Sequence, residues 1–389
     1  MRFFNPCILF MLISHHLIIA DEIFIPQSFK EGQSIEQLIL ISDVDGVVRD
    51  SVDGLADFRV IEAVKALLKH EGVNVTFISG TPIESNQSTL EPWRQGNVPL
   101  NKVFGSLFES EMLEERVAIF GVLGGHRMNR DGSLEVVDEY SPEIACELSV
   151  LLIHAFLNEV LRDGNAQQKM TAAKIKLELD SCASTSITDQ EFKQIVLEIR
   201  EHLDPNFRQL SNGAIIETHT SNPPWGTHYS AKWLHEEMNK PEYLVSHLEP
   251  WQRKIATGFA KKGEDGFNYL LISKTNKGVT TEKHIEELIK RYPQALVVTI
   301  GDTQVDFPMH QNAHLAFHVG LEHVWQNHSL PQCMMIRNSH GHDSQHIEGT
   351  LKVLQLLADG IGKSFHDLKY IPKQDSSGKW NYHSINEIQ

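Results

Sequence analysis

Residues 38–46 read Leu38-Ile39-Leu40-Ile41-Ser42-Asp43-Val44-Asp45-Gly46, an apolar run that stops at a polar turn with glycine. This pattern is typical of a buried parallel strand that runs into a loop. Apolar positions at helical spacing follow over residues 57–70, and a second apolar run, residues 73–78, ends at Ser79-Gly80. The order strand, helix, strand predicts a β-α-β unit in this part of the chain.

The same alternation returns in the second half of the chain. Its predicted strands are 267–272, 295–300, 315–319 and 333–336, and its predicted helices are 280–291, 304–312 and 344–357. Alternating strands and helices predict a Rossmann-like, doubly wound parallel sheet of the α/β class. This sheet is built from two parts of the chain that lie far apart in the sequence.

A chain of 389 residues is longer than one compact core usually grows, so we expect two domains. The residues between the two parts of the sheet mix strand patterns with amphipathic helices, as expected of an inserted α+β domain. Its predicted strands are 117–121, 134–137, 175–179 and 214–217, and its predicted helices are 143–161, 189–202 and 229–238. The predicted boundaries are 21–81 and 267–360 for the sheet domain, 82–266 for the insertion and 361–389 for a polar C-terminal tail.

Residues 1–20 combine one cation, Arg2, with a largely apolar stretch and resemble a secretory signal peptide cleaved after Ala20. A mis-set start codon or a buried N-terminal strand would explain the same residues. A genuine leader implies a secreted or periplasmic protein, and otherwise we expect a cytoplasmic one. The run is too short to cross a membrane, and we find no other stretch of about 18 apolar residues, so we expect no stable membrane span in the mature chain.

The formal net charge of −16, from 35 Lys and Arg against 51 Asp and Glu, excludes nucleic acids and anionic membranes as expected partners. If such a protein handles a phosphate, a metal ion or a few well-placed cations must neutralise it locally. The four cysteines form no Cys-x-x-Cys pair, which argues against a zinc site or a disulfide framework. His340, His342 and His346 could bind a metal, but a solvated surface loop is the favoured interpretation.

Polar residues follow three of the predicted strands at their carboxyl ends, where open α/β sheets bind ligands. Asp43 and Asp45 follow the first strand, Ser79 follows the second, and Asp302 and Asp306 follow the strand that ends at residue 300. Each of these segments alone could be a turn or a helix cap. Together they would bring carboxylates and a hydroxyl to one edge of the sheet.

Lys277, just ahead of a predicted helix, adds a cation to this set. Its simplest interpretation is an exposed lysine, but beside carboxylates and a phosphate it would hold Asp43 ionised and share the charge of the substrate. An aspartate can be a nucleophile toward phosphorus. The residues therefore favour phosphoryl transfer.

The chain resembles the haloacid dehalogenase (HAD) superfamily in four segments that occur in the order of that family's motifs: Asp43-x-Asp45-Gly46, Ser79-Gly80, Lys277-Gly278 and Gly301-Asp302-x-x-x-Asp306. The insertion resembles the large C2-type cap of its subgroup of sugar phosphatases and phosphomannomutase. Residues 121–127, 213–219 and 228–229 look most similar to trehalose-6-phosphate phosphatases. The chain departs from that family at His219, where a lysine is usual, and at Val305, where Asn or Thr is commoner.

The resemblance implies a phosphatase that hydrolyses a phosphomonoester, a sugar phosphate similar to trehalose 6-phosphate, through an aspartyl phosphate. Asp43 would be the nucleophile, and Asp45, protonated at the first step, would serve as acid and then as base. Mg²⁺ would bind Asp43, the backbone carbonyl of Asp45 and Asp302, with Asp306 in support. The phosphate would be held by Ser79, Gly80 and Lys277, and the sugar hydroxyls by the cap residues His126, Glu217, His219 and His228.

Two other functions remain open at this point. A phosphomutase of the phosphomannomutase type uses the same aspartyl phosphate but returns the phosphoryl group to a sugar. A non-catalytic sugar-phosphate-binding protein would keep the fold without turnover. The presence of every expected catalytic side chain favours an enzyme.

Overall fold

The computed structural model describes residues 34–49, 54–84, 98–104, 115–182, 187–211, 213–221, 227–262, 265–326, 330, 332–336, 346–363, 373–374 and 380–381. The predicted leader and most of the predicted tail lie outside these residues, as do His340 and His342.

The larger of the sheets has eight strands in the order β12-β11-β10-β1-β2-β3-β4-β5. The strands from β12 to β3 in this order run parallel, and β4 and β5 extend the sheet as antiparallel strands. Their bounds are β1 Leu38–Ser42, β2 Val73–Ile78, β3 Val117–Gly121, β4 His126–Met128, β5 Leu134–Val136, β10 Leu296–Gly301, β11 Leu315–His318 and β12 Cys333–Met335.

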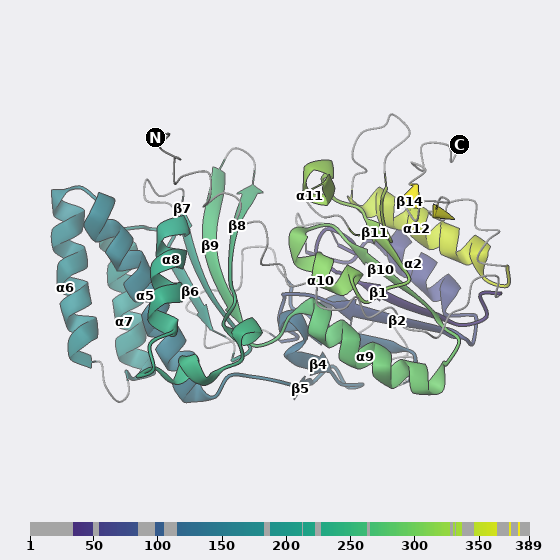
Figure 1. Cartoon of the computed structure of the whole chain (residues 1–389), viewed down its shortest axis with the longest axis horizontal. Coiled ribbons are helices and arrows are strands. Elements are labelled where there is room, and N and C mark those ends of the chain that lie inside the picture. The colour runs from purple at the N-terminus through teal and green to yellow at the C-terminus, as the bar shows by residue number, and fades with distance from the viewer. Residues whose placement is uncertain are drawn as a thin grey trace, which may run out of the picture.

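Helices cover both faces of this sheet because neighbouring strand residues point to opposite faces. Leu38 and Leu40 of β1 share a core with α2 (Phe58–Leu67) and α12 (His346–Gly360). Ile39 and Ile41 share another core with α9 (Lys277–Arg291) and α10 (Phe307–His310). Figure 1 shows α9 on one side of the sheet and α2 and α12 on the other. The predicted doubly wound α/β sheet is therefore confirmed.

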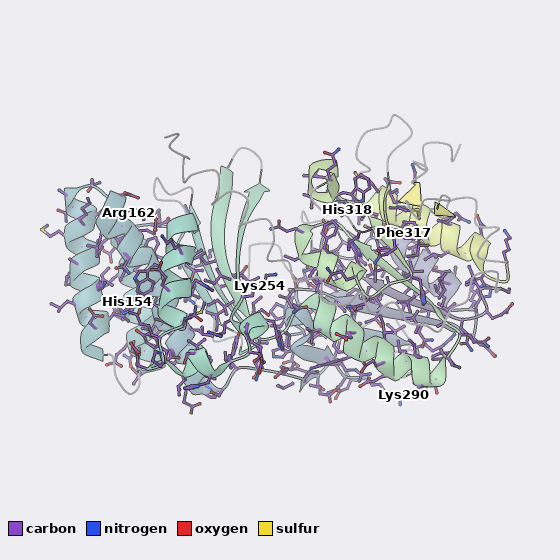
Figure 2. The ribbon with its side chains drawn as sticks, in the orientation of Figure 1. His154, Arg162, Lys254, Lys290, Phe317 and His318 are labelled. Atoms are coloured by element: carbon purple, nitrogen blue, oxygen red, sulfur yellow. The ribbon has the colours of Figure 1, made fainter. Side chains whose placement is uncertain are left out.

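Side chains of β11 also point alternately to the two faces of the sheet, and one of them contacts the first residue of α10. Phe317 faces the core shared with α2 and α12, whereas His318 faces the other side and is fully buried (Figure 2). The ring of His318 stacks on Phe307, the first residue of α10, with centroids 5.7 Å apart. Since Asp306 directly precedes Phe307, this stacking holds Asp306 close to the end of the sheet.

The strand register brings the predicted polar residues to one edge. Ser42, the last residue of β1, lies opposite Ile300 of β10 and Phe77 of β2. The backbone N–H of Asp43 continues the pairing by donating to the carbonyl of Ile300 at 2.9 Å. Because all three strands run parallel, the residues that follow them emerge side by side, and one of these is Ser79.

A second sheet has four antiparallel strands in the order β6-β7-β9-β8. Ile216 of β7 packs against the helices on one face, and Ile215 packs against Val122 and Leu123 of the larger domain. Figure 1 shows the helices on the face away from the larger sheet. We call this sheet and its helices the cap: β6 Arg208–Ser211, β7 Ile215–Ser221, β8 Ile255–Lys262, β9 Asp265–Ser273, α5 Pro142–Asp163, α6 Ala166–Cys182, α7 Asp189–His202 and α8 Thr227–Met238.

Sequence signals explain where the cap helices begin. Ser141 caps α5 by accepting from the backbone N–H of Ile144 at 3.4 Å, and Pro142 occupies the first turn, where no backbone donor is needed. Thr188 and Glu191 form a capping box at the start of α7. The shorter elements are α3 Leu100–Phe104, α11 Glu322–Gln326, β13 Lys373–Gln374, β14 Trp380–Asn381 and the 3₁₀ turns Val122–Gly124, Leu244–His247, Pro250–Arg253 and Gln304–Asp306.

The strand pairing differs from the predicted boundaries of the insertion at both ends. Strands β3 to β5 lie within the predicted insertion, 82–266, but extend the larger sheet from β2. The predicted strand 267–272 was assigned to the sheet domain but lies in β9, at the centre of the cap sheet. An apolar run indicates a strand and does not say which sheet the strand joins.

One predicted strand of the insertion is wrong. Residues 175–179 alternate between apolar and charged side chains, as a strand would, but they lie in helix α6. In the helix Ile175 and Leu179 are fully buried, while Leu177 between them is 70% exposed. Helical spacing from Ala172, also buried, explains which side chains reach the core.

Helix α5 has the length and apolar composition of a membrane span, with a mean hydropathy of 1.7 over its best window, and is the one such helix in the described ranges. The sequence reading missed this stretch. In the structure 61% of the window is buried. Its residues form the cap core with α8 and the cap sheet, and His154 on α5 lies beside Trp233 of α8, with ring centroids 6.2 Å apart (Figure 2). Helix α5 is therefore the central helix of the cap here.

Candidate active site

The ammonium group of Lys277 lies between two buried carboxylates. Its Nζ is 2.6 Å from Oδ1 of Asp43 and 2.6 Å from Oδ1 of Asp306. Lys277 is the first residue of α9, where Asn276 caps the helix by accepting from the backbone N–H of Val279 at 2.9 Å. Burial lowers the pKa of Lys277, but the two carboxylates outweigh it and raise the pKa above its ordinary value. Lys277 therefore stays charged beside Asp43.

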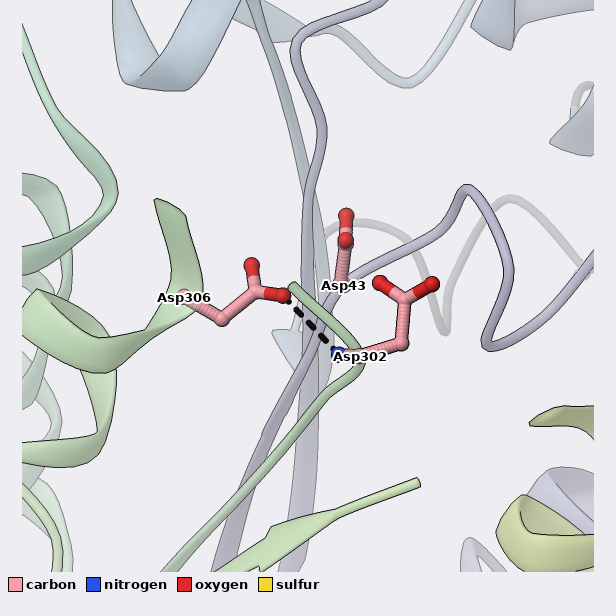
Figure 3. Close-up of side chains that lie close together, drawn as sticks. All are labelled: Asp43, Asp302 and Asp306. Atoms are coloured by element: carbon pink, nitrogen blue, oxygen red, sulfur yellow. Dashed lines mark hydrogen bonds between the residues drawn. The ribbon is translucent and has the colours of Figure 1, made fainter. Parts of the chain in front are cut away.

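Asp306 connects this lysine to the backbone at the end of β10. Its Oδ2 accepts a hydrogen bond from the backbone N–H of Asp302 at 2.9 Å (Figure 3) and another from the backbone N–H of Thr303 at 2.9 Å. Burial raises the pKa of Asp306, but Lys277 and His310 lower it below its ordinary value. Both oxygens of Asp306 are thus occupied. This suits a supporting role better than direct coordination.

The site is short of positive charge. Burial raises the pKa of Asp43 well above its ordinary value, Asp306 and Asp302 add to this, and Lys277 only partly offsets it. Burial also raises the pKa of Asp302. One ammonium group therefore does not balance three neighbouring carboxylates, and a further cation would be stabilised here.

The oxygen donors fit a divalent metal ion. The carboxylates of Asp43, Asp302 and Asp306 each offer an oxygen, and these oxygens lie within 4.8 Å of one another (Figure 3). Oδ1 of Asp302 is buried and has no hydrogen-bond partner among the residues that the structure describes. A buried carboxylate oxygen without a donor is unfavourable. Because clustered carboxylate oxygens suit hard cations such as Mg²⁺, the donor set fits the predicted metal.

Asp45 contacts a buried arginine that the sequence reading did not identify. Nε of Arg49 donates to Oδ1 of Asp45 at 2.8 Å, and Nη2 donates to the hydroxyl of Thr81 at 2.8 Å. The side chain of Arg49 is 1% exposed and that of Asp45 is 41% exposed. Burial raises the pKa of Asp45, but Arg49 and the hydroxyl of Ser79 lower it below its ordinary value. Asp45 is therefore ionised in this arrangement, which differs from the protonated state expected at the first step.

Ser79 and Gly80 lie next to Asp45. The hydroxyl of Ser79 donates to Oδ2 of Asp45 at 2.6 Å and accepts from the backbone N–H of Thr81 at 2.9 Å. The N–H of Gly80 donates to no group in the described part of the chain. The Gly80 amide is thus available to an anion, whereas the Ser79 hydroxyl is engaged by Asp45.

A strained loop holds these residues in place. Val122 and Leu123 have φ angles of 55° and 57°, which is unusual for side chains larger than glycine and most unfavourable for the β-branched Val122. The N–H of Leu123 donates to the carbonyl of Ser79 at 2.8 Å, and its carbonyl accepts from the hydroxyl of Thr280 at 3.0 Å. The loop therefore joins the end of β2 to α9, which carries Lys277.

The four predicted substrate residues are placed differently from one another. His126 lies in β4 of the larger sheet rather than in the cap, is 6% exposed and contacts the carboxylate of Glu139. Glu217 lies in β7 opposite Leu271, on the cap face that is turned toward the larger domain. The backbones of His219 and His228 lie in β7 and α8, and their side chains are outside the described residues.

His346 lies at the site, which the sequence reading did not anticipate. It is the first residue of α12, and its Nδ1 is 3.0 Å from Oδ2 of Asp302. The interpretation as a solvated surface loop is therefore wrong for His346. His340 and His342 lie outside the described residues. No pattern in the sequence links His346 to Asp302, because the contact depends on where α12 packs.

No family model matches the chain, and no curated protein matches its sequence. Solved structures resemble it at low identity. A haloacid dehalogenase-like hydrolase from Bacteroides thetaiotaomicron is 13% identical with a TM-score of 0.42, over 82% of this chain and 99% of that one. A haloacid dehalogenase-like hydrolase from B. subtilis is 12% identical with a TM-score of 0.40, over 82% and 98%. A sugar phosphatase of HAD subclass IIB is 11% identical with a TM-score of 0.40, over 82% and 99%.

Proposed function

We propose that this protein is a magnesium-dependent phosphatase that transfers the phosphoryl group of a small phosphomonoester to Asp43 and then to water. One observation carries the proposal. Asp43 is buried at the carboxyl edge of a parallel sheet, with Lys277 on one oxygen and the unpartnered Oδ1 of Asp302 nearby. A nucleophile, a fixed cation and oxygen donors for a metal are the groups that phosphoryl transfer to an aspartate requires.

Asp43 is oriented for attack by its hydrogen bonds. Its Oδ1 accepts from the backbone N–H of Val44 at 2.6 Å and from Lys277 at 2.6 Å. In the described part of the chain no donor contacts Oδ2. Attack by Asp43 forms an oxygen–phosphorus bond as the bond from phosphorus to the substrate oxygen breaks. Because the carboxylate is already fixed, little orientational freedom is lost in reaching the transition state.

Local groups explain how an acidic protein can hold an anion. Lys277 and the N–H of Gly80 would bind the non-bridging oxygens of the phosphoryl group during its transfer. A divalent metal ion, when bound by Asp43 and Asp302 with Asp306 in support, would supply the remaining positive charge. The ammonium and amide positions are fixed by α9 and by the loop at Val122 and Leu123. The charge of the phosphate is therefore met without any extended basic surface.

Asp45 has to leave Arg49 before it can act as an acid. Its side chain is 41% exposed, so it can turn toward a leaving group while Arg49 stays buried. Once turned away from the Arg49 guanidinium, Asp45 would have a higher pKa, could take up a proton from solvent and could donate that proton to the departing oxygen. After this step Asp45 is a carboxylate again and can take a proton from the water that hydrolyses the aspartyl phosphate.

The substrate in this proposal is a sugar phosphate similar to trehalose 6-phosphate. Glu217 supports a hydroxyl-rich substrate, because its carboxylate is an acceptor on the cap face turned toward the larger domain. His219 and His228 remain candidates for further contacts. We also propose that residues 1–20 are a cleaved leader and that the protein is exported. N-terminal sequencing of the mature protein would test this, because a cleaved leader leaves a chain that begins after Ala20.

The experiment is phosphate release by the purified full-length protein over a panel of phosphorylated sugars, with and without Mg²⁺. Asp43→Asn keeps the size of the side chain and removes the nucleophile, and Asp131→Asn, at an exposed turn, is the matched control. We expect release that requires Mg²⁺, survives in the control and falls by ~10³-fold or more in Asp43→Asn. Equal release by Asp43→Asn would exclude this nucleophile, and labelled phosphate kept in a bisphosphorylated sugar would indicate a phosphomutase.

A further inference from the structure

The two oxygens of Asp302 have different surroundings. Oδ1 is buried without a hydrogen-bond partner in the described part of the chain, and the carboxylate group belongs to the cluster with Asp43 and Asp306. Oδ2 is 3.0 Å from Nδ1 of His346. Asp302 would bind a cation as an ionised carboxylate, which can only accept, so in that state Nδ1 of His346 would be the donor. This hydrogen bond fixes which oxygen faces the cation site.

The backbone at Gly46 closes the space on the other side of Oδ2. A Cβ atom at Gly46 would lie 2.1 Å from Oδ2 of Asp302 and 3.4 Å from Nδ1 of His346. Gly46 also has a φ of +79°, which glycine adopts without strain. The carboxylate of Asp302 therefore lies between the turn after Asp45 and the ring of His346, and it has little freedom to rotate.

We propose that His346 is a positioning residue for the metal site, which holds Oδ2 of Asp302 so that Oδ1 is directed toward the cation. The inference rests on the proposed function, since it concerns the metal of that same site. His346 does not need to touch the substrate or the metal. Outer hydrogen bonds of this kind orient ligand carboxylates, and their removal typically weakens metal affinity by about 10–100-fold.

Two matched substitutions test the position of the donor. In His346→Asn the side-chain amide can donate from about the place of Nδ1, whereas in His346→Gln the donor lies further out. Both substituted side chains are polar, and the side chain of His346 is 41% exposed, so both variants should fold. Glu348→Gln is the control, because Glu348 lies in the first turn of the same helix and pairs with the exposed Arg59.

The measurement is Mg²⁺ binding by titration calorimetry on the full-length protein without substrate. We expect His346→Gln to weaken binding by about 10-fold or more, and His346→Asn and Glu348→Gln to keep most of the affinity. Equal affinity in His346→Gln and the unchanged protein would overturn the inference and leave the proposed function intact. If His346→Asn and His346→Gln weaken Mg²⁺ binding equally, the proposed role of the Nδ1 donor would be overturned. An unchanged protein that binds no Mg²⁺ would contradict the proposed function itself.

Discussion

Lys277 and Asp43 form a buried ion pair, with Nζ 2.6 Å from Oδ1, although the whole cap separates them in the sequence. The pair exists because β1 ends where α9 begins, and α9 starts directly after the last cap strand. Where the chain passes from the cap back to the larger domain, Lys277 is thus placed next to Asp43, the candidate nucleophile.

Replacing Lys277 with Met should reduce both stability and turnover. Two buried carboxylates would lose their partner, and breaking a buried ion pair typically costs about 3–5 kcal/mol. Loss of one fixed donor to the phosphoryl group should lower kcat by about 10²–10³-fold. Lys290→Ala is the control, since Lys290 is exposed in the last turn of the same helix (Figure 2). Urea unfolding and steady-state kinetics of both variants provide the measurement, and similar behaviour of the two would contradict the assigned role of Lys277.

Gly124→Ala should destabilise the strained loop far more than Gly132→Ala. Both glycines have a positive φ, but a Cβ atom at Gly124 would lie 1.8 Å from the hydroxyl oxygen of Thr280, and one at Gly132 would meet nothing within 4 Å. We expect a loss of roughly 1–2 kcal/mol at Gly132 from backbone strain alone. At Gly124 overpacking adds to this, for a total of about 3 kcal/mol or more. Chemical denaturation tests both, and equal losses would show that the loop does not pack tightly on α9.

The protein should lose stability in mild acid through His284. Burial, with a smaller contribution from Arg127, lowers the pKa of His284 to about 4. An unfolded histidine has a pKa of about 6.5, so between pH ~6.5 and ~4 the unfolded chain binds a proton that the folded protein excludes. Stability is therefore complete above this window and falls as the pH drops, by roughly 3 kcal/mol across it.

His284→Leu should remove this part of the pH dependence while keeping a side chain of similar size against Phe120. Unfolding free energies at several pH values in the window would measure the effect. His235→Gln on the exposed face of α8 is the control and should follow the unchanged protein. An acid slope that persists in His284→Leu would show that other groups cause it.

The strands that hold the site were predictable from the sequence because each is an apolar run that stops at polar residues. Strand β2 matches its predicted bounds, and β1 ends at Ser42 as expected. Because β1 and β10 pair in parallel, Asp43 and Asp302, which follow these two strands, are expected at the same edge of the sheet. The placement of Lys277 beside Asp43 does not follow in this way, because the strand before Lys277, β9, belongs to the cap sheet.

The remaining features depend on packing that no local pattern encodes. No sequence motif includes Arg49, yet this residue is buried and binds backbone carbonyls of Gly54 and Val98 as well as Asp45. His346 reaches Asp302 only because α12 packs on the sheet. The strand pattern at 175–179 was overridden by its helical neighbours, since Leu177 can point to solvent in α6.

The most direct test of the central claim is peptide mass spectrometry of the full-length protein, acid-quenched during turnover of its best phosphorylated sugar with Mg²⁺. The account predicts one phosphoryl group on the peptide that contains Asp43, lost on treatment with hydroxylamine as an acyl phosphate should be, and absent from Asp43→Asn. Active turnover with an unmodified Asp43 peptide, or with the phosphoryl group on another residue, would contradict it.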